Sequence, residues 1–314
     1  MQLQQLEANP NRSALADFEK GLLNETPHIE FKFFYDKLGS HLFSAITELP
    51  EYYPTRIESE IFAFHAKKIS HEFNGLKELI DLGAGNCAKA EALFSVLGID
   101  RYTAVDVSVE YLTETLKHLQ ARHPAMDIKG IGLDFSETLL PLKKCVEGPA
   151  IVFYPGSSIG NFAPAETRRF LSQVRALACG GGLLIGVDLV KDKAVLELAY
   201  DDPLGVTAAF NLNMLRHVNR SMGADFDVSD WAHFSFFNEA QSRIEMHLRA
   251  KRAVTVSWQT GSRKFLEGDL LHTENSYKWT VPRFSALLTE LGYSQVKAWT
   301  DPKHQFAVFS AHAI

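Results

Sequence analysis

Short apolar runs alternate with segments of helical period through the middle of the chain. Apolar runs at five places predict strands, at residues 78–82, 102–106, 128–133, 150–154 and 183–188. Three segments between them repeat their apolar residues at helical spacing, near residues 88–97, 109–123 and 165–178. Short, continuously apolar strands that alternate with helices are typical of a mostly parallel sheet covered on both faces. The pattern therefore predicts an α/β core.

A helix is also predicted ahead of this series, over residues 57–72. Its apolar stripe comprises Ile57, Ile61 and Phe64, and Ile69 can extend it. Two prolines bracket the pair Tyr52–Tyr53 just before it. Because proline lacks an N–H and restricts the residue before it, we expect this tyrosine pair on a rigid, non-helical segment.

The pattern changes after Val190. Residues 193–222 have a helical period, and residues 243–250 then alternate strictly between apolar and charged or polar side chains. Such alternation predicts a half-exposed antiparallel strand, which is foreign to a buried parallel sheet. A helix at residues 281–291 and strands at 294–299 and 305–311 return to the α/β style.

These changes predict two domains. We expect a sheet domain made of residues 57–192 and 278–314. The second domain is expected to contain residues 1–56 together with the insertion 193–277. No internal repeat or low-complexity tract interrupts either part.

Composition narrows the class of protein. The 314 residues are 46% hydrophobic, which is ample for a core. A net charge of −6 without a basic stripe argues against a nucleic-acid partner. No apolar run approaches the about 20 residues of a membrane helix, and the polar N-terminus lacks the apolar core of a signal peptide. We expect a cytoplasmic monomer with no membrane partner.

Two residue types bear on metals and redox chemistry. The three cysteines lie far apart and form no CxxC pair, which favours reduced thiols. The twelve histidines show no HxH or HExxH spacing, so we expect no metal site.

The turn from Gly83 to Ala88 carries the clearest chemistry. It follows the strand 78–82 and leads into a helix. Glycines at 83 and 85 let the backbone approach a ligand closely, and the helix N-terminus supplies unpaired N–H groups. Asp106 ends the next strand, at the spacing where a carboxylate can hold a ribose. The sequence therefore predicts a cofactor that contains a nucleoside.

Two cofactors fit this turn. The spacing satisfies the G-x-G-x-x-A dinucleotide fingerprint, so NAD is one candidate. Three features resemble enzymes that use S-adenosylmethionine (SAM): Asp81 two residues before the first glycine, Asp134-Phe135 after the third strand, and a C-terminal pair of strands. Lys89 lies in the first helical turn, where the dipole disfavours a cation; either the carboxylate of SAM relieves this conflict or the lysine points to solvent.

Several long strings extend the resemblance to most of the chain. They run over residues 49–56, 155–161, 188–192, 199–202, 205–211 and 223–227. They are similar to the SAM-dependent histidine Nα-methyltransferases of ergothioneine biosynthesis, over roughly residues 31–310. That family makes trimethylhistidine (hercynine) by three methylations of one amine.

The resemblance implies a Rossmann-like class I methyltransferase sheet with an inserted α+β substrate-binding domain, and L-histidine as the small-molecule substrate. The residues expected at the cofactor are Tyr35, Gly83, Gly85, Lys89, Asp106, Asp134 and Phe135. Those expected at the substrate are Tyr52, Gly156, Asn161, Tyr200, Met246, Glu274 and Ser276, with Tyr52 and Asn161 also in catalysis.

The substrate residues make chemical sense by themselves. Glu274 and Ser276 lie two apart, so on an extended segment they can face the two nitrogens of one imidazole. Taken alone, Glu274 would most often face solvent, and Asn161 would usually be a turn or capping residue. Three alternatives stay open at this stage: a methyltransferase for another amine, an NAD-dependent oxidoreductase, and a binding module that senses histidine or SAM.

Overall fold

The computed structural model describes residues 2–6, 10–136 and 138–313. The chain divides into two compact units. The first comprises Met1–Leu6, Tyr53–Lys191 and Tyr277–Ile314, and the second comprises Glu7–Tyr52 and Asp192–Ser276.

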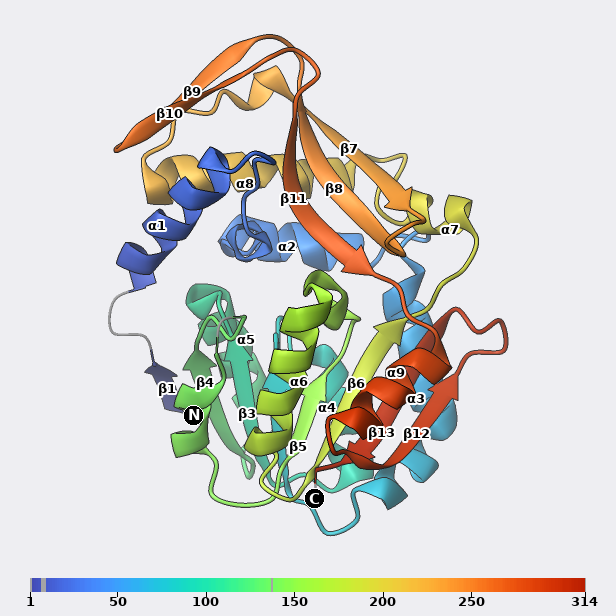
Figure 1. The fold of residues 1–314 in the computed structure, drawn as a ribbon. Coiled ribbons are helices and arrows are strands. Elements are labelled where there is room, and N and C mark those ends of the chain that lie inside the picture. The colour runs from blue at the N-terminus through green and yellow to red at the C-terminus, as the bar shows by residue number, and fades with distance from the viewer. Residues whose placement is uncertain (1, 7–9, 137, 314) are drawn as a thin grey trace. The chain divides into compact units, whose positions relative to one another are not determined.

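An eight-stranded sheet forms the centre of the first unit (Figure 1). Its strands run in the order β1-β4-β3-β2-β5-β6-β13-β12. Their bounds are β1 (Gln2–Gln5), β4 (Asp127–Gly132), β3 (Arg101–Asp106), β2 (Glu78–Leu82), β5 (Ile151–Tyr154), β6 (Gly182–Asp188), β13 (Phe306–His312) and β12 (Ser294–Thr300). The first six in this order are parallel, and β13 pairs antiparallel with both β6 and β12. The structure confirms the expected α/β class and its Rossmann-like sheet.

Five α-helices surround this sheet in the chain order of a βα series. They are α3 (Tyr53–Glu72), α4 (Ala88–Leu97), α5 (Val109–Arg122), α6 (Pro164–Leu177) and α9 (Val281–Glu290), with shorter 3₁₀ turns at η2 (Leu140–Cys145) and η3 (Ser158–Asn161). Every residue of β2, β5 and β6 is buried. Because alternate side chains of a strand point to opposite faces, both faces of the sheet are covered.

The strand β1 was not expected. It pairs in parallel with β4, from Gln2 opposite Lys129 to Gln5 opposite Gly132. The first residues therefore lie with the sheet, and not with the segment 1–56 in which we expected them.

The helix α3 differs from its prediction at its start and along its buried face. It begins at Tyr53, with Pro54 in its first turn. Proline is tolerated there because the N–H groups of the first turn have no partner inside the helix, so the expectation of a non-helical tyrosine pair is wrong for Tyr53. Phe64 is 84% exposed, whereas Phe62 is buried. The predicted stripe was therefore wrong at Phe64.

The second unit combines helices with antiparallel strands. The helices are α1 (Pro10–Leu23), η1 (Phe31–Phe34), α2 (Lys37–Ile46), α7 (Lys193–Leu198), α8 (Val206–Met222) and η4 (Val228–Asp230). Three strands form a sheet in the order β11-β8-β7, with bounds β11 (Leu270–Tyr277), β8 (Arg243–Ala250) and β7 (Trp231–Asn238). The remaining strands, β9 (Val254–Trp258) and β10 (Gly261–Phe265), form a hairpin.

The helical period of residues 193–222 belongs to two helices, α7 and α8. The break between them contains Pro203 and Gly205, and Gly205 has a φ of +73°. The carboxylate of Asp202 accepts hydrogen bonds from the backbone N–H groups of Val206 and Thr207 at 3.0 and 2.7 Å. Periodicity alone did not reveal this restart, because the apolar spacing continues across the break.

The strand β8 is less exposed than its alternation predicted. Glu245 and His247, on its polar face, are both buried. The ring of His247 stacks on Phe236 of β7 at a centroid distance of 5.7 Å. The expectation of a half-exposed strand was wrong because β8 is the middle strand of its sheet, and neighbouring aromatic side chains cover its polar residues.

Gly181 provides a test of how tightly the first unit is packed. A Cβ at this position would lie 2.1 Å from the backbone oxygen of Ala150, an atom that cannot rotate away. We expect Gly181→Ala to cost about 1–3 kcal/mol of folding free energy, as overpacking generally does. Thermal unfolding should show a melting temperature several degrees below that of the parent chain.

The matched control is Gly148→Ala, where an added Cβ meets nothing within 4 Å. This variant should melt at or slightly above the parent temperature. Equal melting temperatures for the two variants would contradict the packing described for Gly181.

Candidate active site

The glycine turn after β2 is held open by its backbone conformation. Gly83 and Gly85 have φ values of +73° and +52°, and Cys87 shares the left-handed region with a φ of 59°. The N–H groups of Gly83 and Ala84 donate to the carbonyl of Val105 at 2.8 and 3.1 Å. The turn is therefore fastened to the end of β3, where a side chain at Gly83 or Gly85 would be conformationally strained.

Asp106 organises the same edge of the sheet. Its carboxylate accepts hydrogen bonds from the N–H of Gly85 and from the N–H of Ser108, both at 2.9 Å. Burial raises the pKa of Asp106, and these backbone hydrogen bonds act in the opposite direction. The predicted ribose acid thus lies directly beside the glycine turn.

Phe135 follows β4 and lies close to the glycine turn. A Cβ on Gly83 would lie 3.6 Å from the tip of the Phe135 ring, which is ordinary contact distance. The carboxylate of Asp134 accepts hydrogen bonds from the N–H and the hydroxyl of Ser136, at 3.1 and 2.5 Å. The structure therefore gathers Gly83, Gly85, Asp106 and Phe135 at the carboxyl ends of adjacent strands, as an open α/β sheet requires of a ligand site.

Lys89 does not point freely to solvent. Its ammonium group lies 2.5 Å from the carboxylate of Glu58, which is fully buried on α3. The same carboxylate accepts a hydrogen bond from the N–H of Gly156 at 2.8 Å. Glu58 thus joins Lys89 of α4 to Gly156 in the loop after β5. Both contacts are hydrogen bonds to a buried carboxylate, which are stronger than those between neutral groups.

Glu58 was missed at the level of sequence. The signal that could have found it is its position, three and four residues before the buried Ile61 and Phe62, on the buried face of α3. A carboxylate on such a face needs a cation or several N–H donors. Its partner Lys89 is distant in the sequence, so spacing alone could not name it.

Asp81 lies on β2, two residues before the first glycine of the turn. It is 2% exposed and accepts a hydrogen bond from the hydroxyl of Tyr102 at 2.7 Å, while its other carboxylate oxygen is buried without a hydrogen-bond partner among the described residues. Burial raises the pKa of Asp81 to about 7, against the opposing hydrogen bond from Tyr102. An acid held this way can take up a proton near neutrality, or accept a donor from a ligand.

Asn161 is also in the first unit. It is the last residue of η3 and is half-buried, after the carboxyl end of β5. Its amide offers both a donor and an acceptor.

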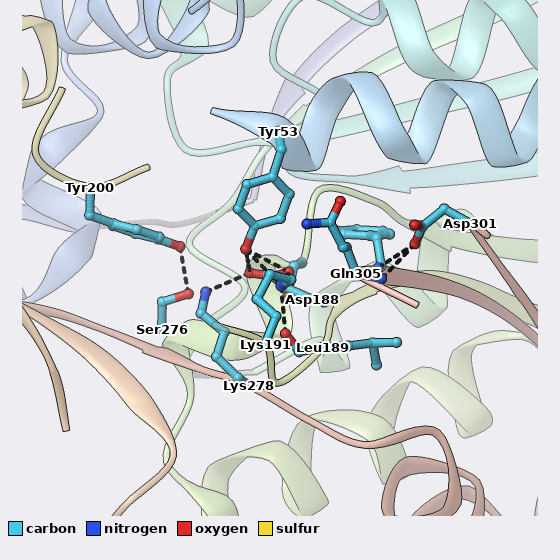
Figure 2. Close-up of polar contacts among 11 residues, drawn as sticks. Tyr53, Asp188, Leu189, Lys191, Tyr200, Ser276, Lys278, Asp301 and Gln305 are labelled. Carbon is cyan, nitrogen blue, oxygen red and sulfur yellow. Dashed lines mark hydrogen bonds and ion pairs between the residues drawn. The ribbon is translucent and has the colours of Figure 1, made fainter. Parts of the chain in front are cut away.

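Three predicted substrate residues come together in the second unit. The hydroxyl of Tyr200 donates to the hydroxyl of Ser276 at 2.7 Å (Figure 2). The rings of Tyr52 and Tyr200 meet edge to face at 6.4 Å. Tyr52 ends one segment of this unit, Tyr200 follows α7, and Ser276 lies on β11, so tertiary folding alone brings them to one place.

Tyr35 joins the same aromatic cluster. Its ring contacts Phe43 at 5.9 Å, and Phe43 in turn contacts Tyr52 at 6.2 Å. Tyr35 therefore belongs to the second unit, whereas the other six residues expected at the cofactor belong to the first.

The remaining substrate candidates lie on the three-stranded sheet. Glu274 is half-buried on β11, two residues before the buried Ser276. Met246 is 1% exposed, on the middle strand β8. The strand β11 thus carries both Glu274 and Ser276, and the adjacent strand β8 carries a buried thioether.

The described residues also bear on membrane spans and on metal ligands. No helix among them is long and apolar enough to span a bilayer. Over the same residues, no group of three or more histidine, cysteine or acidic side chains could hold a metal ion.

Comparison with known proteins decides between the cofactors. A family model described as histidine-specific, SAM-dependent methyltransferase matches residues 14–313. The cofactor is therefore SAM, and the glycine cradle beneath Phe135, together with the orphaned oxygen of Asp81, fits a ligand of that kind.

Curated relatives agree with the family model. The histidine N-alpha-methyltransferase of Mycolicibacterium smegmatis is 38% identical over 299 residues, which is 93% of this chain and 92% of that protein. Its counterpart from Mycobacterium tuberculosis is 36% identical over the same shares of both chains. The N-methyltransferase fsqC of Aspergillus fumigatus is 27% identical over 96% of this chain and 84% of its own. The chain belongs to the family of SAM-dependent, histidine-specific methyltransferases.

Proposed function

We propose that this chain transfers methyl groups from SAM to the α-amine of L-histidine and completes three transfers, giving trimethylhistidine (hercynine). The observation that carries the proposal is the meeting of Tyr52, Tyr200 and Ser276 in the second unit, with two hydroxyls 2.7 Å apart. The family membership and the mycobacterial histidine N-alpha-methyltransferases support the choice of acceptor.

The first unit is proposed to hold the methyl donor. Gly83 and Gly85 would admit the nucleoside, Asp106 would address its ribose, and Phe135 would cover its base. Lys89 would bind the carboxylate of the methionine portion, held ready by Glu58. When bound, SAM supplies a methyl group on a positively charged sulfur, which is a good leaving group.

The second unit is proposed to hold the imidazole of histidine. Glu274 would accept a hydrogen bond from one ring N–H, and Ser276 would complement the other nitrogen. The hydrogen bond from Tyr200 fixes the rotamer of the Ser276 hydroxyl. Asn161, in the first unit, offers the donor and acceptor that suit an α-amino and carboxylate pair, and Gly156 and Met246 complete the proposed substrate residues.

Each transfer needs a neutral amine. A free α-amine is mostly protonated at pH 7. Loss of one proton frees the nitrogen lone pair, which forms the N–C bond while the C–S bond breaks and the sulfur keeps its electron pair. Three repeats release three protons and leave a quaternary ammonium. The rings of Tyr52 and Tyr200 can stabilise such a cation by their π faces.

The product distribution tests the proposed function. The purified chain is incubated with SAM and a panel of free amino acids and amines, and the masses of the products are measured by mass spectrometry. We expect histidine to gain one, two and then three methyl units, with the trimethylated form accumulating. Accumulation of dimethylhistidine would refute the proposed third transfer. Methylation of a different amine in preference to histidine would refute histidine as the acceptor.

Glu274 tests the imidazole contact. We expect Glu274→Gln to raise the KM for histidine on the order of 10- to 100-fold, because a charged hydrogen-bond acceptor is lost. Calorimetric binding of SAM should stay unchanged, since the predicted cofactor turn belongs to the other unit.

The control is Glu267→Gln, an exposed acid ahead of the same strand. It should keep the parent KM for histidine. A parent-like KM in Glu274→Gln would show that another group recognises the imidazole.

A further inference from the structure

Beyond residue 50 the chain passes from one unit into the other three times. It does so between Tyr52 and Tyr53, between Lys191 and Asp192, and between Ser276 and Tyr277. In the first unit, a side chain at or next to each passage reaches the same acid, Asp188 at the end of β6 (Figure 2). These side chains are Tyr53, Lys191 and Lys278.

The contacts with Asp188 are short and use both carboxylate oxygens. The ammonium of Lys191 lies 2.5 Å from one oxygen, and the ammonium of Lys278 lies 2.8 Å from the other. The hydroxyl of Tyr53 lies 2.8 and 3.0 Å from the two oxygens, and it accepts a hydrogen bond from Lys191 at 2.8 Å. One carboxylate thus ties three segments that are far apart in the sequence.

The cluster is out of water. The side chains of Asp188 and Lys278 are 1% and 0% exposed, and that of Lys191 is 7% exposed. Burial by itself would raise the pKa of Asp188, but the ammonium groups of Lys278 and Lys191 outweigh it and hold that pKa below its ordinary value. Burial lowers the pKa of Lys191 to about 8, although Asp188 opposes this shift. Charges in so dry a place interact strongly, and each depends on its partners.

Backbone hydrogen bonds reinforce the tie. The N–H of Asp188 donates to the hydroxyl of Ser157 at 2.8 Å, and its carbonyl accepts from the N–H of Trp279 at 3.0 Å. The N–H of Val190 donates back to the carbonyl of Trp279 at 2.9 Å. The segments before the second passage and after the third are therefore joined by one parallel bridge, between Leu189 and Trp279.

The proposed substrate residues follow these ties along the chain. Tyr52 directly precedes Tyr53, and Ser276 lies two residues before Lys278. Tyr200 follows Lys191 through the single short helix α7. Within the second unit, Tyr200 contacts both Ser276 and Tyr52. The three segments are thus joined on both sides of the passages.

We propose that Asp188 is a positioning residue for the acceptor: by fixing Tyr53, Lys191 and Lys278 in the first unit, it fixes the points at which the segments that carry Tyr52, Tyr200 and Ser276 join that unit, and thereby tunes histidine binding. This inference rests on the proposed function. Small displacements of binding groups cost much in affinity and rate, so a buried tie at the start of each segment has a functional consequence beyond stability.

Tyr53→Phe is the mildest test, because it removes one hydroxyl from the cluster. We expect the KM for histidine to rise on the order of tenfold, as for a lost hydrogen bond to a charged group, with unchanged SAM affinity. The matched control is Tyr293→Phe. Its buried hydroxyl donates to the carbonyl of Leu171 at 2.8 Å, in the same unit but away from the three passages. A purely structural role would make KM follow the melting temperature in both variants alike.

A second variant removes the acid itself. Asp188→Asn alone leaves two buried lysines without their carboxylate and can fail to fold, so it is combined with Lys278→Met, which keeps the net charge of the cluster unchanged. We expect this double variant to bind SAM normally and to have a larger KM for histidine than Tyr53→Phe.

The outcomes separate the two claims. The parent chain can methylate histidine while Tyr53→Phe and the double variant keep its KM for histidine. That result would overturn the role of Asp188 and leave the proposed function standing. A rise of KM in Tyr293→Phe equal to that in Tyr53→Phe would likewise overturn it. Absence of methylated histidine with the parent chain would instead refute the proposed function.

Discussion

The buried carboxylate of Asp188 is the interaction that joins three distant segments of the first unit. A domain inserted into a sheet domain is joined to it through several chain connections. At each connection the backbone can adopt more than one conformation unless other contacts fix it. Here Tyr53, Lys191 and Lys278 share one acid next to three of those passages. The free energy of such a cluster depends on all its members, because removing one leaves the others buried without compensation. Stability and geometry are therefore coupled at the same residues.

The cofactor half follows a similar logic with different groups. Glu58 is buried and joins Lys89 to the loop at Gly156, while Asp106 fastens the glycine turn to the end of β3. Both acids accept hydrogen bonds from backbone N–H groups. Asp106 is also a predicted cofactor ligand, and Glu58 holds Lys89, which is another. Such shared use keeps polar side chains in place before any ligand arrives, which reduces the reorganisation that binding requires.

Much of the fold could be predicted from the sequence because its strands are continuously apolar. The segment 78–82 was predicted with the bounds of β2, and the other sheet strands of the βα series within one residue. The strands β7 and β11 were missed, since their buried and exposed residues do not alternate regularly. Pattern alone also could not separate Phe62 from Phe64, which differ by about half a turn of helix.

The site was predictable where residue strings resemble a family, and not where it depends on tertiary partners. Tyr52 and Tyr200 lie in such strings, Ser276 was named from the same resemblance, and the structure brings the three together. Glu58 and Asp188 were not assigned a role, although Asp188 begins one of the strings, because the cations that define them are supplied by distant segments.

We propose that the second unit selects histidine through Glu274 and Ser276. A crystal structure of the chain with L-histidine and S-adenosylhomocysteine tests it most directly. We expect the carboxylate of Glu274 and the hydroxyl of Ser276 within hydrogen-bond distance of the two imidazole nitrogens. An imidazole held by other residues, with both of these side chains turned away from it, would contradict this proposal.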